Sequence, residues 1–245
     1  MTILAMLWQM VAISRAFEPS IFPTIDVIIK ALWNSITNGK IIGESVYSLL
    51  LISKGLLIGL GSAVLIASLC MFSKIFHEFV DTVAAMAHPL PGVALLPLII
   101  LWMGTGANAI IFIIVHSVIW PMLLNILIGF REIPAIYNEV GQNFELSRVK
   151  SILYIMVPAS FPYILVGTKI GWARAWRALI SAEMIFGAAG GKGGLGWYIF
   201  QKRVFMDTVG IYAGLIIIIF IGIFVEDFIF EKIEKLTVKR WGTYV

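Results

Sequence analysis

The sequence predicts an all-α membrane protein that crosses the bilayer about six times, and its composition, its long apolar runs and its sparse charge lead to that prediction. Hydrophobic residues make up 60% of the 245 residues, and charged residues only 13%. Soluble domains average about 45–50% apolar and about 25% charged residues. A water-soluble fold could not bury this much apolar surface, and six spans leave no room for a large soluble domain.

Six apolar runs, taken in order, give the expected spans. They cover residues 2–14, 46–72, 76–103, 109–130, 161–189 and 208–230. A membrane helix needs roughly 20 residues, so the first run is marginal in length. It lacks a basic n-region and a small-residue cleavage site, and we interpret it as a short span and not as a signal peptide. No internal repeat is visible, so residues 1–245 are expected to form one transmembrane domain.

The segment between the first two expected spans has a different pattern. Pro19 and Pro23 interrupt the chain, after which isoleucine and leucine recur at helical spacing over residues 25–36. Asp26 and Lys30 lie opposite these apolar positions. The pattern predicts an amphipathic helix that lies along the membrane surface.

Prolines mark the third expected span. Pro89, Pro91 and Pro97 each remove a backbone donor and clash with the preceding turn, so this span should be bent or broken. Broken membrane helices are tolerated where they line a cavity or pack against protein. The stretch from His88 to Trp102 is therefore a candidate for the wall of a pathway, with a simple packing kink as the alternative.

Ionisable side chains mark the fifth expected span, and such residues are costly inside a bilayer and often functional. At 100° per residue, Trp176 and Glu183 share one face and Arg174 lies on another. All three are pathway candidates, with structural pairing to another helix as the alternative. An uncompensated arginine near the midplane would lower the barrier for a negative solute, so Arg174 favours an anionic substrate.

Several other kinds of site are not expected in this chain. The formal net charge of +4 comes from Lys and Arg at the ends of apolar runs, which is typical of membrane flanks and not of nucleic-acid binding. His88 and His116 are too isolated to predict a metal site. The glycine-rich residues 187–196 lack the Lys-Ser/Thr pair of a phosphate loop and are interpreted as an outer turn. We therefore expect no cofactor and no ATP site here.

The longest polar interruption covers residues 131–162, and it is too long and too patterned for a simple connection between helices. Pro134 can open a helix, Ser147 can cap one, and Pro158 can stop one. A pair of short helices with an apolar edge is expected, which would suit docking of a soluble partner. The distribution of Lys and Arg weakly favours a cytoplasmic N-terminus, which would place this segment in the cytoplasm.

This segment resembles the EAA loop of permease subunits in binding-protein-dependent ABC importers, whose pattern is E-A-A-x3-G-x9-I-x-L-P. Glu139 and Pro158 have the family's spacing. Val140 and Gly141 replace the two alanines, and Glu145 stands where the family usually has glycine.

The resemblance extends from about residue 19 to residue 241. Over this range the chain is similar to the nitrate, sulfonate and taurine branch of these permeases. The stretches that carry it are His88-Pro89-Leu90-Pro91-Gly92, Leu101-Trp102-Met103-Gly104, Arg174-Ala175, Ala182-Glu183-Met184 and Gly194-Leu195-Gly196. The resemblance implies a type I ABC importer permease fold in the inner membrane. It also implies that ATPase coupling involves Glu139, Val140, Gly141, Glu145 and Pro158.

The same resemblance implies a set of partners. These are a pair of ABC ATPase subunits that hold ATP and Mg²⁺, an extracytoplasmic substrate-binding protein, and a second permease copy, most simply in a homodimer. The implied cargo is a small anion such as nitrate, a sulfonate, taurine or bicarbonate, with a heterocyclic vitamin precursor as an alternative. An independent channel or ion-coupled carrier is the rival interpretation. No catalytic residues are expected, because no protease motif is present.

Overall fold

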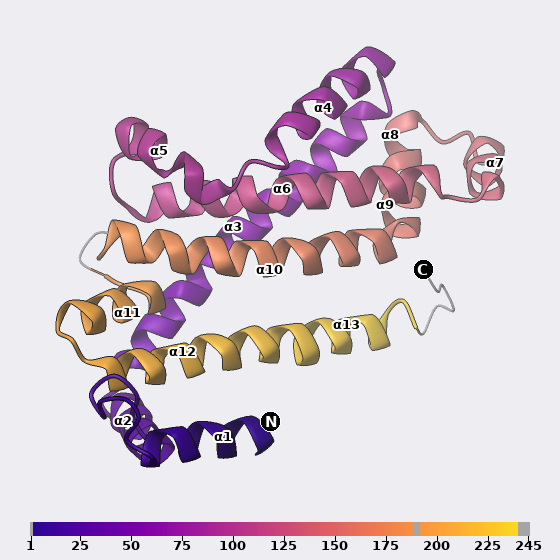
Figure 1. Cartoon of the computed structure of the whole chain (residues 1–245). Coiled ribbons are helices and arrows are strands. Elements are labelled where there is room, and N and C mark those ends of the chain that lie inside the picture. Colours follow the sequence, from indigo (N-terminus) through magenta and orange to yellow (C-terminus); the bar gives the residue numbers. More distant parts are fainter. Residues whose placement is uncertain (1, 189–191, 240–245) are drawn as a thin grey trace.

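The computed structural model describes residues 2–188 and 192–239, and every element within those ranges is a helix (Figure 1). In chain order the elements are α1 (Thr2–Ile13), α2 (Ile25–Thr37), α3 (Lys40–Cys70), α4 (Lys74–Ala87), η1 (Gly92–Leu95), α5 (Leu96–Met103), α6 (Ala107–Arg131), α7 (Ala135–Asn143), α8 (Arg148–Ser151), η2 (Ile152–Met156), α9 (Val157–Ala159), α10 (Phe161–Phe186), α11 (Leu195–Val204), α12 (Thr208–Ile223), η3 (Phe224–Phe230) and α13 (Glu231–Leu236). The predicted all-α class is confirmed.

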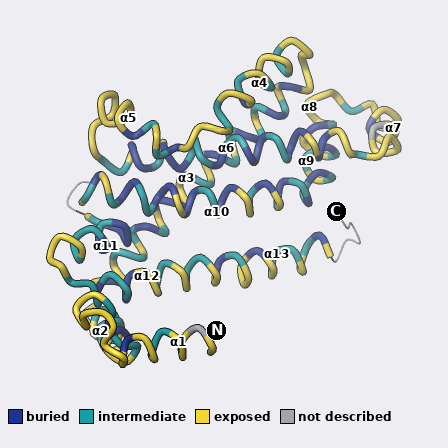
Figure 2. Tube along the Cα trace, viewed as in Figure 1, coloured by how far each residue is buried: buried dark blue, intermediate teal, exposed yellow. Residues whose placement is uncertain are grey.

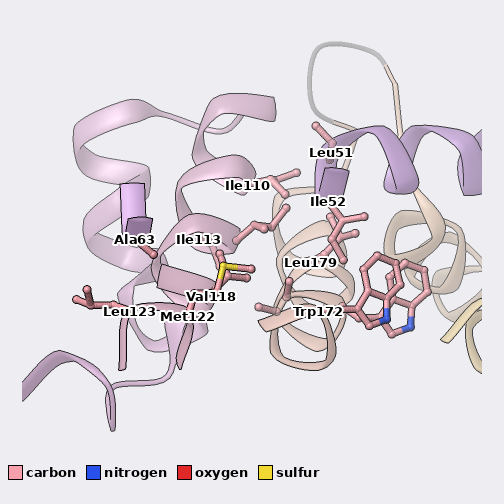
Figure 3. Packing of buried hydrophobic residues seen from close by; sticks show 14 of the residues in the cluster. Leu51, Ile52, Ala63, Ile110, Ile113, Val118, Met122, Leu123, Trp172 and Leu179 are labelled. Atoms are coloured by element: carbon pink, nitrogen blue, oxygen red, sulfur yellow. The ribbon is translucent and has the colours of Figure 1, made fainter. Parts of the chain in front are cut away.

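Helices α3, α6 and α10 form the centre of the molecule, because α6 packs along both of the others. Figure 3 shows Ile113 of α6 and Ile52 of α3 within one cluster, and both side chains are 0% exposed. A Cβ atom at Gly55 of α3 would lie 2.3 Å from Ile114 Cγ2, so glycine is what permits this close approach. Small residues at helix contacts are typical of membrane proteins, in which packing and not the hydrophobic effect drives association.

The periphery is apolar and exposed. Figure 2 shows burial concentrated on α6 and on parts of α10 and α11, whereas α1 and α5 are mostly exposed. Large side chains face outward there, including Leu57, 71% exposed, and Leu101, 79% exposed. Such a surface suits lipid or another membrane protein and not water.

Helix length and composition support three to five of the six expected spans within the described residues. Three stretches are long and apolar enough to cross a bilayer, namely α3, α6 and residues 208–236. Two bent pairs, α4 with η1–α5 and α8–α9 with α10, raise the total to five if each pair is one span. Helix α1 has 12 residues, which is short for the roughly 20 that a span needs.

The break in the third span lies where the prolines predicted it. The two halves, α4 and η1–α5, meet at 87°. Pro89 and Pro91 lie between the halves, and Pro97 occupies the first turn of α5, where a missing N–H costs nothing. The amphipathic helix predicted over residues 25–36 is α2.

Two details differ from the prediction. The fifth span ends at Phe186, because Gly187 takes a left-handed φ of 73° that ends the helix, and residue 189 lies outside the described ranges. Helix α11 was not predicted, because residues up to 196 were interpreted as a turn. In Figure 1, α5 and α11 lie at one end of the long helices α6 and α10, and α7, α8 and α9 lie at the other.

Candidate functional site

A cavity of about 460 Å³ lies where the broken third span faces α6 and α10. Its walls come from three parts of the chain that are distant in sequence. The lining residues are His88, Pro89, Leu90, Pro91, Gly92 and Val93 from the break, His116, Ser117 and Trp120 from α6, and Arg174, Arg177, Ala178 and Ser181 from α10. The break lies close to α6, and Gly92 permits this approach because a Cβ atom there would lie 2.6 Å from Ser117 Oγ.

The wall that α10 contributes is positively charged. Arg174 and Arg177 are one helical turn apart, and no described residue that lines the cavity is acidic. Within residues 2–188 and 192–239, Arg174 forms neither an ion pair nor a hydrogen bond. Arg177 Nε donates to the carbonyl of Ala173 at 3.0 Å, which leaves its terminal nitrogens available. The cavity is therefore an electropositive compartment beside the packed core.

The wall that α6 contributes carries buried polar atoms without partners. His116 Nδ1 and Trp120 Nε1 are both buried, and neither makes a hydrogen bond with the part of the chain that the structure describes. Their rings lie one helical turn apart, with centroids 6.3 Å apart. Neither residue was among the predicted pathway residues; their spacing of four in an apolar helix was the available signal.

The structure brings together four of the seven predicted pathway residues. His88, Pro89, Pro91 and Arg174 line the cavity. Trp102 does not, and it is 72% exposed at the end of α5. Trp176 stacks on Trp172 with centroids 5.6 Å apart, and a Cβ atom at Gly222 of α12 would lie 3.5 Å from its Nε1.

Glu183, the seventh, lies away from the cavity in a buried polar network. Its side chain and that of Ser48 on α3 are both 0% exposed. Ser48 Oγ lies 2.8 Å and 2.9 Å from the two carboxylate oxygens of Glu183. The backbone N–H of Gly196 donates to Glu183 Oε2 at 2.9 Å, and that of Leu195 donates to Ser48 Oγ at 2.9 Å.

This network explains the helix that was not predicted. Leu195 and Gly196 begin α11, and their N–H groups have no partner within the helix, so Glu183 and Ser48 cap it from two other helices. A Cβ atom at Gly194 would lie 2.0 Å from Glu183 Oε1, and one at Gly196 would lie 2.3 Å from the carbonyl oxygen of Ile180. The glycines therefore serve close packing at this position.

The segment 131–162 contains short helices, as predicted. Helix α7 ends in a Schellman motif, in which Leu146 N–H donates to the Gly141 carbonyl at 3.0 Å and Glu145 N–H to the Gln142 carbonyl at 2.9 Å. Such an ending needs a left-handed residue, and Glu145 has a φ of 49°. The position where the resembling family usually has glycine is thus a position that favours glycine physically.

Helix α7 packs on η2 through Gly141, where a Cβ atom would lie 2.9 Å from Ile155 Cδ1. The π-helix η2 precedes Pro158, whose ring is exposed in α9. Glu139 is exposed, and Val140 is 41% exposed. Large apolar side chains are exposed along the same segment, namely Ile136, Tyr137, Phe144, Val149, Leu153 and Tyr154.

An ionic cluster joins the start of this segment to α4. Arg131 ends α6, and its Nη2 lies 2.5 Å from His77 Nε2 and 3.9 Å from Asp81 Oδ2. His77 Nε2 lies 3.3 Å from the same Asp81 oxygen. All three side chains are partly exposed, so the cluster fixes geometry more than it adds stability.

No group of three or more potential metal ligands occurs within residues 2–188 and 192–239. The ionisable residues that line the cavity are two arginines and two histidines. Such a site can bind and orient a polar solute, but its residues do not form a nucleophile with an adjacent base.

Comparisons with known proteins identify the family of this chain. Residues 55–239 match the family described as "Binding-protein-dependent transport system inner membrane component". The chain is 28% identical over 238 residues to SsuC of Bacillus subtilis (strain 168), a permease protein assigned to aliphatic sulfonates transport, covering 97% of this chain and 84% of that protein. It is 28% identical to the nitrate import permease protein NrtB of Synechocystis sp., covering 76% and 64%. It is 27% identical to the bicarbonate transport system permease protein CmpB of Synechococcus elongatus, covering 71% and 59%.

Proposed function

We propose that this chain, which belongs to the family of binding-protein-dependent transport system inner membrane components, is the transmembrane subunit of an ATP-driven importer for a small anionic solute. As a member of that family it is a multi-pass permease of the inner membrane. The single observation that supports an anionic substrate is the cavity, which has Arg174 and Arg177 on one wall and no acidic residue among its described lining residues.

The charge of the cavity supports an anion on physical grounds. An ion at membrane depth loses most of its hydration, so a fixed opposite charge must offset that loss. The unpaired guanidinium of Arg174 supplies such a charge. The volume of about 460 Å³ falls within the roughly 300–1,000 Å³ of small-molecule sites. The named cargoes of the relatives, sulfonates, nitrate and bicarbonate, are all small oxyanions.

The energy for transport is proposed to come from a pair of ATPase subunits that dock on the segment 131–162. The apolar side chains exposed there, with Phe144 at 74% and Tyr154 at 71%, suit a groove on a soluble partner. Glu139, Gly141 and Pro158 are assigned to this coupling, which agrees with the packed α7–η2 unit around Gly141. ATP and Mg²⁺ would bind to the ATPases, and this chain would carry out no covalent chemistry.

The remaining partners are proposed from the family to which the chain belongs. One chain offers one docking segment, so two ATPases that close together need two permease copies, most simply in a two-fold dimer. A binding protein would deliver the anion at the opposite end, where α5 and α11 lie (Figure 1). This arrangement requires the segment 131–162 to be cytoplasmic.

The proposal is tested by producing this chain with the ATPase and binding protein encoded beside it. We expect the ATPase to co-purify, and the reconstituted complex to take up radiolabelled nitrate, bicarbonate or ethanesulfonate only with ATP. Arg174→Gln should lower uptake at least about tenfold while the ATPase is retained, because the barrier for the anion rises. Lys169→Gln, which removes an exposed cation of the same helix α10 outside the cavity, is the matched control. Unchanged uptake by Arg174→Gln would refute the anion site.

The coupling role is tested separately with Glu139→Lys. This exposed residue should tolerate the change in the folded chain, so membrane insertion and thermal stability stay normal while uptake is lost. Glu78→Lys, at an exposed glutamate of α4, is the control. If no ATPase co-purifies with the wild-type chain, the importer function itself is wrong.

A further inference from the structure

The ionic cluster at the end of α6 joins the segment 131–162 to the broken third span. We infer that His77, Asp81 and Arg131 are positioning residues that transmit movement of this segment to the cavity wall, and that a proton on His77 Nε2 weakens the link. This role rests on the proposed function and deepens it, because it names the contact through which closure of the ATPases reaches the anion site.

The place of the cluster in the chain is the first observation. Arg131 is the last residue of α6 and the first of the segment 131–162, whereas His77 and Asp81 lie one helical turn apart on α4. Arg131 Nη2 lies 2.5 Å from His77 Nε2 and 3.9 Å from Asp81 Oδ2. A displacement at the start of the segment is therefore passed to α4, which is not its neighbour in the sequence.

The setting of α4 is the second observation. Of its 14 residues only Val80 and Ala84 are buried, so little packing holds the helix in place. His88 follows the last residue of α4 and lines the cavity, and at roughly 1.5 Å per residue it lies about 10 Å along the helix from Asp81. A rigid helix with few fixed contacts can carry a movement between two sites. Helix α4 thus connects the cluster to the cavity wall.

The third observation is that one nitrogen of His77 faces two partners that require opposite protonation. A guanidinium can only donate, so Nε2 must carry no hydrogen when it accepts from Arg131. An ionised carboxylate can only accept, so the contact of 3.3 Å between the same nitrogen and Asp81 Oδ2 needs a hydrogen on Nε2. Neutral His77 therefore binds Arg131, whereas protonated His77 binds Asp81 and repels the guanidinium. Protonation leaves the 3.9 Å contact of Arg131 with Asp81 as the link within this cluster.

The other ionisable groups near the cluster come from three places. Lys74 and Glu78 of α4 pair with each other, with 3.8 Å between their charged atoms. The buried thiol of Cys70, which ends α3, is within electrostatic range of Asp81, and the exposed Glu132 follows Arg131. Histidine is the side chain that ordinarily changes its charge between about pH 5 and pH 8, so a pH profile over this range reports on His77.

The test measures ATP hydrolysed per anion imported by the complex of this chain with its ATPase and binding protein in proteoliposomes. The probe is whichever of radiolabelled nitrate, bicarbonate and ethanesulfonate the wild-type complex imports. Asp81→Arg and Arg131→Asp each place like charges together, so we expect each to raise this ratio at least about fivefold. The double variant restores opposite charges and should return to within about twofold of the wild type.

Glu78→Gln is the matched control, because Glu78 is an exposed acid of the same helix that pairs with Lys74, and it should keep the wild-type ratio. A cluster that only supported the fold would lower uptake and hydrolysis together and leave the ratio unchanged. An unchanged ratio in both single variants, or a double variant that is no better than they are, would overturn the positioning role.

The role of the proton is tested with His77→Gln, which also keeps the positioning role open to test if charge reversal prevents assembly. The amide can accept from Arg131 and donate to Asp81 without titrating. We expect the wild-type ratio of ATP to anion to rise at least about twofold between about pH 8 and pH 5.5, and the His77→Gln ratio to rise less. The ATPase and binding protein are the same in both complexes, so their own pH dependence cancels. Parallel profiles would overturn the role of the proton.

Failure of the proposed function has a different signature. If the wild-type complex retains no ATPase or imports no anion, both the proposed function and the role of the cluster are wrong. If the wild type imports an anion with ATP and every variant keeps its ratio and its pH profile, the importer assignment stands and the role of the cluster fails.

Discussion

Glu145 shows how one backbone angle accounts for a family pattern. Its φ of 49° places it in the left-handed region, where a side chain costs about 1–2 kcal/mol. The Schellman motif that ends α7 imposes this conformation through the hydrogen bonds of Leu146 and Glu145. The departure from the family's glycine is visible in the sequence, and the structure shows that it places a side chain at a left-handed position.

Glu145→Gly should therefore stabilise the chain. Relief of the left-handed strain is partly offset by the backbone entropy of glycine, so we expect a net gain of about 0.5–1 kcal/mol. The measurement is the melting temperature of the purified chain in detergent. Glu139→Gly is the control of opposite sign, because that residue lies within α7, where glycine costs about 1 kcal/mol. A lower melting temperature for Glu145→Gly would contradict the argument.

Residue types predicted one wall of the cavity but not the other. Arg174 was identified because charge inside a span is rare and conspicuous. His116 and Trp120 were not, because amphipathic aromatic rings within an apolar helix are usually packed and satisfied. Only the tertiary structure shows that Nδ1 and Nε1 lack partners beside a cavity.

At the scale of elements, the prolines predicted a break in a helix, whereas the glycine-rich stretch did not predict the helix that follows it. The break in the third span was predicted because three prolines forbid a straight helix locally, and the 87° bend confirms it. Helix α11 was not predicted because its first N–H groups are capped by distant side chains. Glu183 is 13 residues from Gly196, whose N–H it accepts, and Ser48 is 147 residues from Leu195, whose N–H it accepts. A local pattern cannot show a cap that is supplied by another helix.

The junction of α11 and α12 predicts a defined pH dependence. Lys202 Nζ lies 2.6 Å from Asp207 Oδ2, and Asp207 Oδ1 accepts the N–H of Gly210 at the start of α12. Although partial burial opposes both shifts, the Lys202–Asp207 hydrogen bond lowers the pKa of Asp207 and raises the pKa of Lys202. The lowered pKa means that the contribution of Asp207 is complete above about pH 5 and is lost as the pH falls through its folded value.

The raised pKa of Lys202 sets the other limit, because its contribution is complete below about pH 10 and is lost only above that. The melting temperature of Asp207→Asn should thus lie below that of the wild type by a constant amount from about pH 5 to pH 9, and the gap should narrow below about pH 4. Glu132→Gln, at an exposed carboxylate that follows α6, is the control. A gap that persists at low pH would show that the ion pair is not responsible.

At the scale of the whole molecule, the two ends of the helix bundle differ in chemistry. The end with α7, α8 and α9 has exposed aromatic side chains, and the other end has the polar clamp of Glu183 and Ser48 (Figure 1). The pattern of the segment 131–162 predicted the short helices with an apolar edge at the first end. The second end depends on which helices meet, and hydropathy does not contain that information.

The clamp gives a prediction about the whole bundle, because Ser48 joins α3 to both α10 and α11 through hydrogen bonds to Glu183 and Leu195. Ser48→Ala leaves the Leu195 N–H without its acceptor in a fully buried place, so we expect a loss of about 1–3 kcal/mol in the free energy of unfolding.

Ser45→Ala is the matched control, because among the described residues Ser45 Oγ bonds only the Ile41 carbonyl of its own helix, at 2.6 Å. That change should be nearly neutral, since the carbonyl keeps its place in the helix. The measurement is thermal unfolding of each purified variant, together with proteolysis at Lys202 and Arg203 of α11. If Ser48→Ala melts with Ser45→Ala and α11 is cleaved no faster than in the wild type, the clamp does not hold the three helices together. Faster cleavage at α11 in Ser48→Ala alone would instead locate the lost stability at the end of the bundle where the clamp lies.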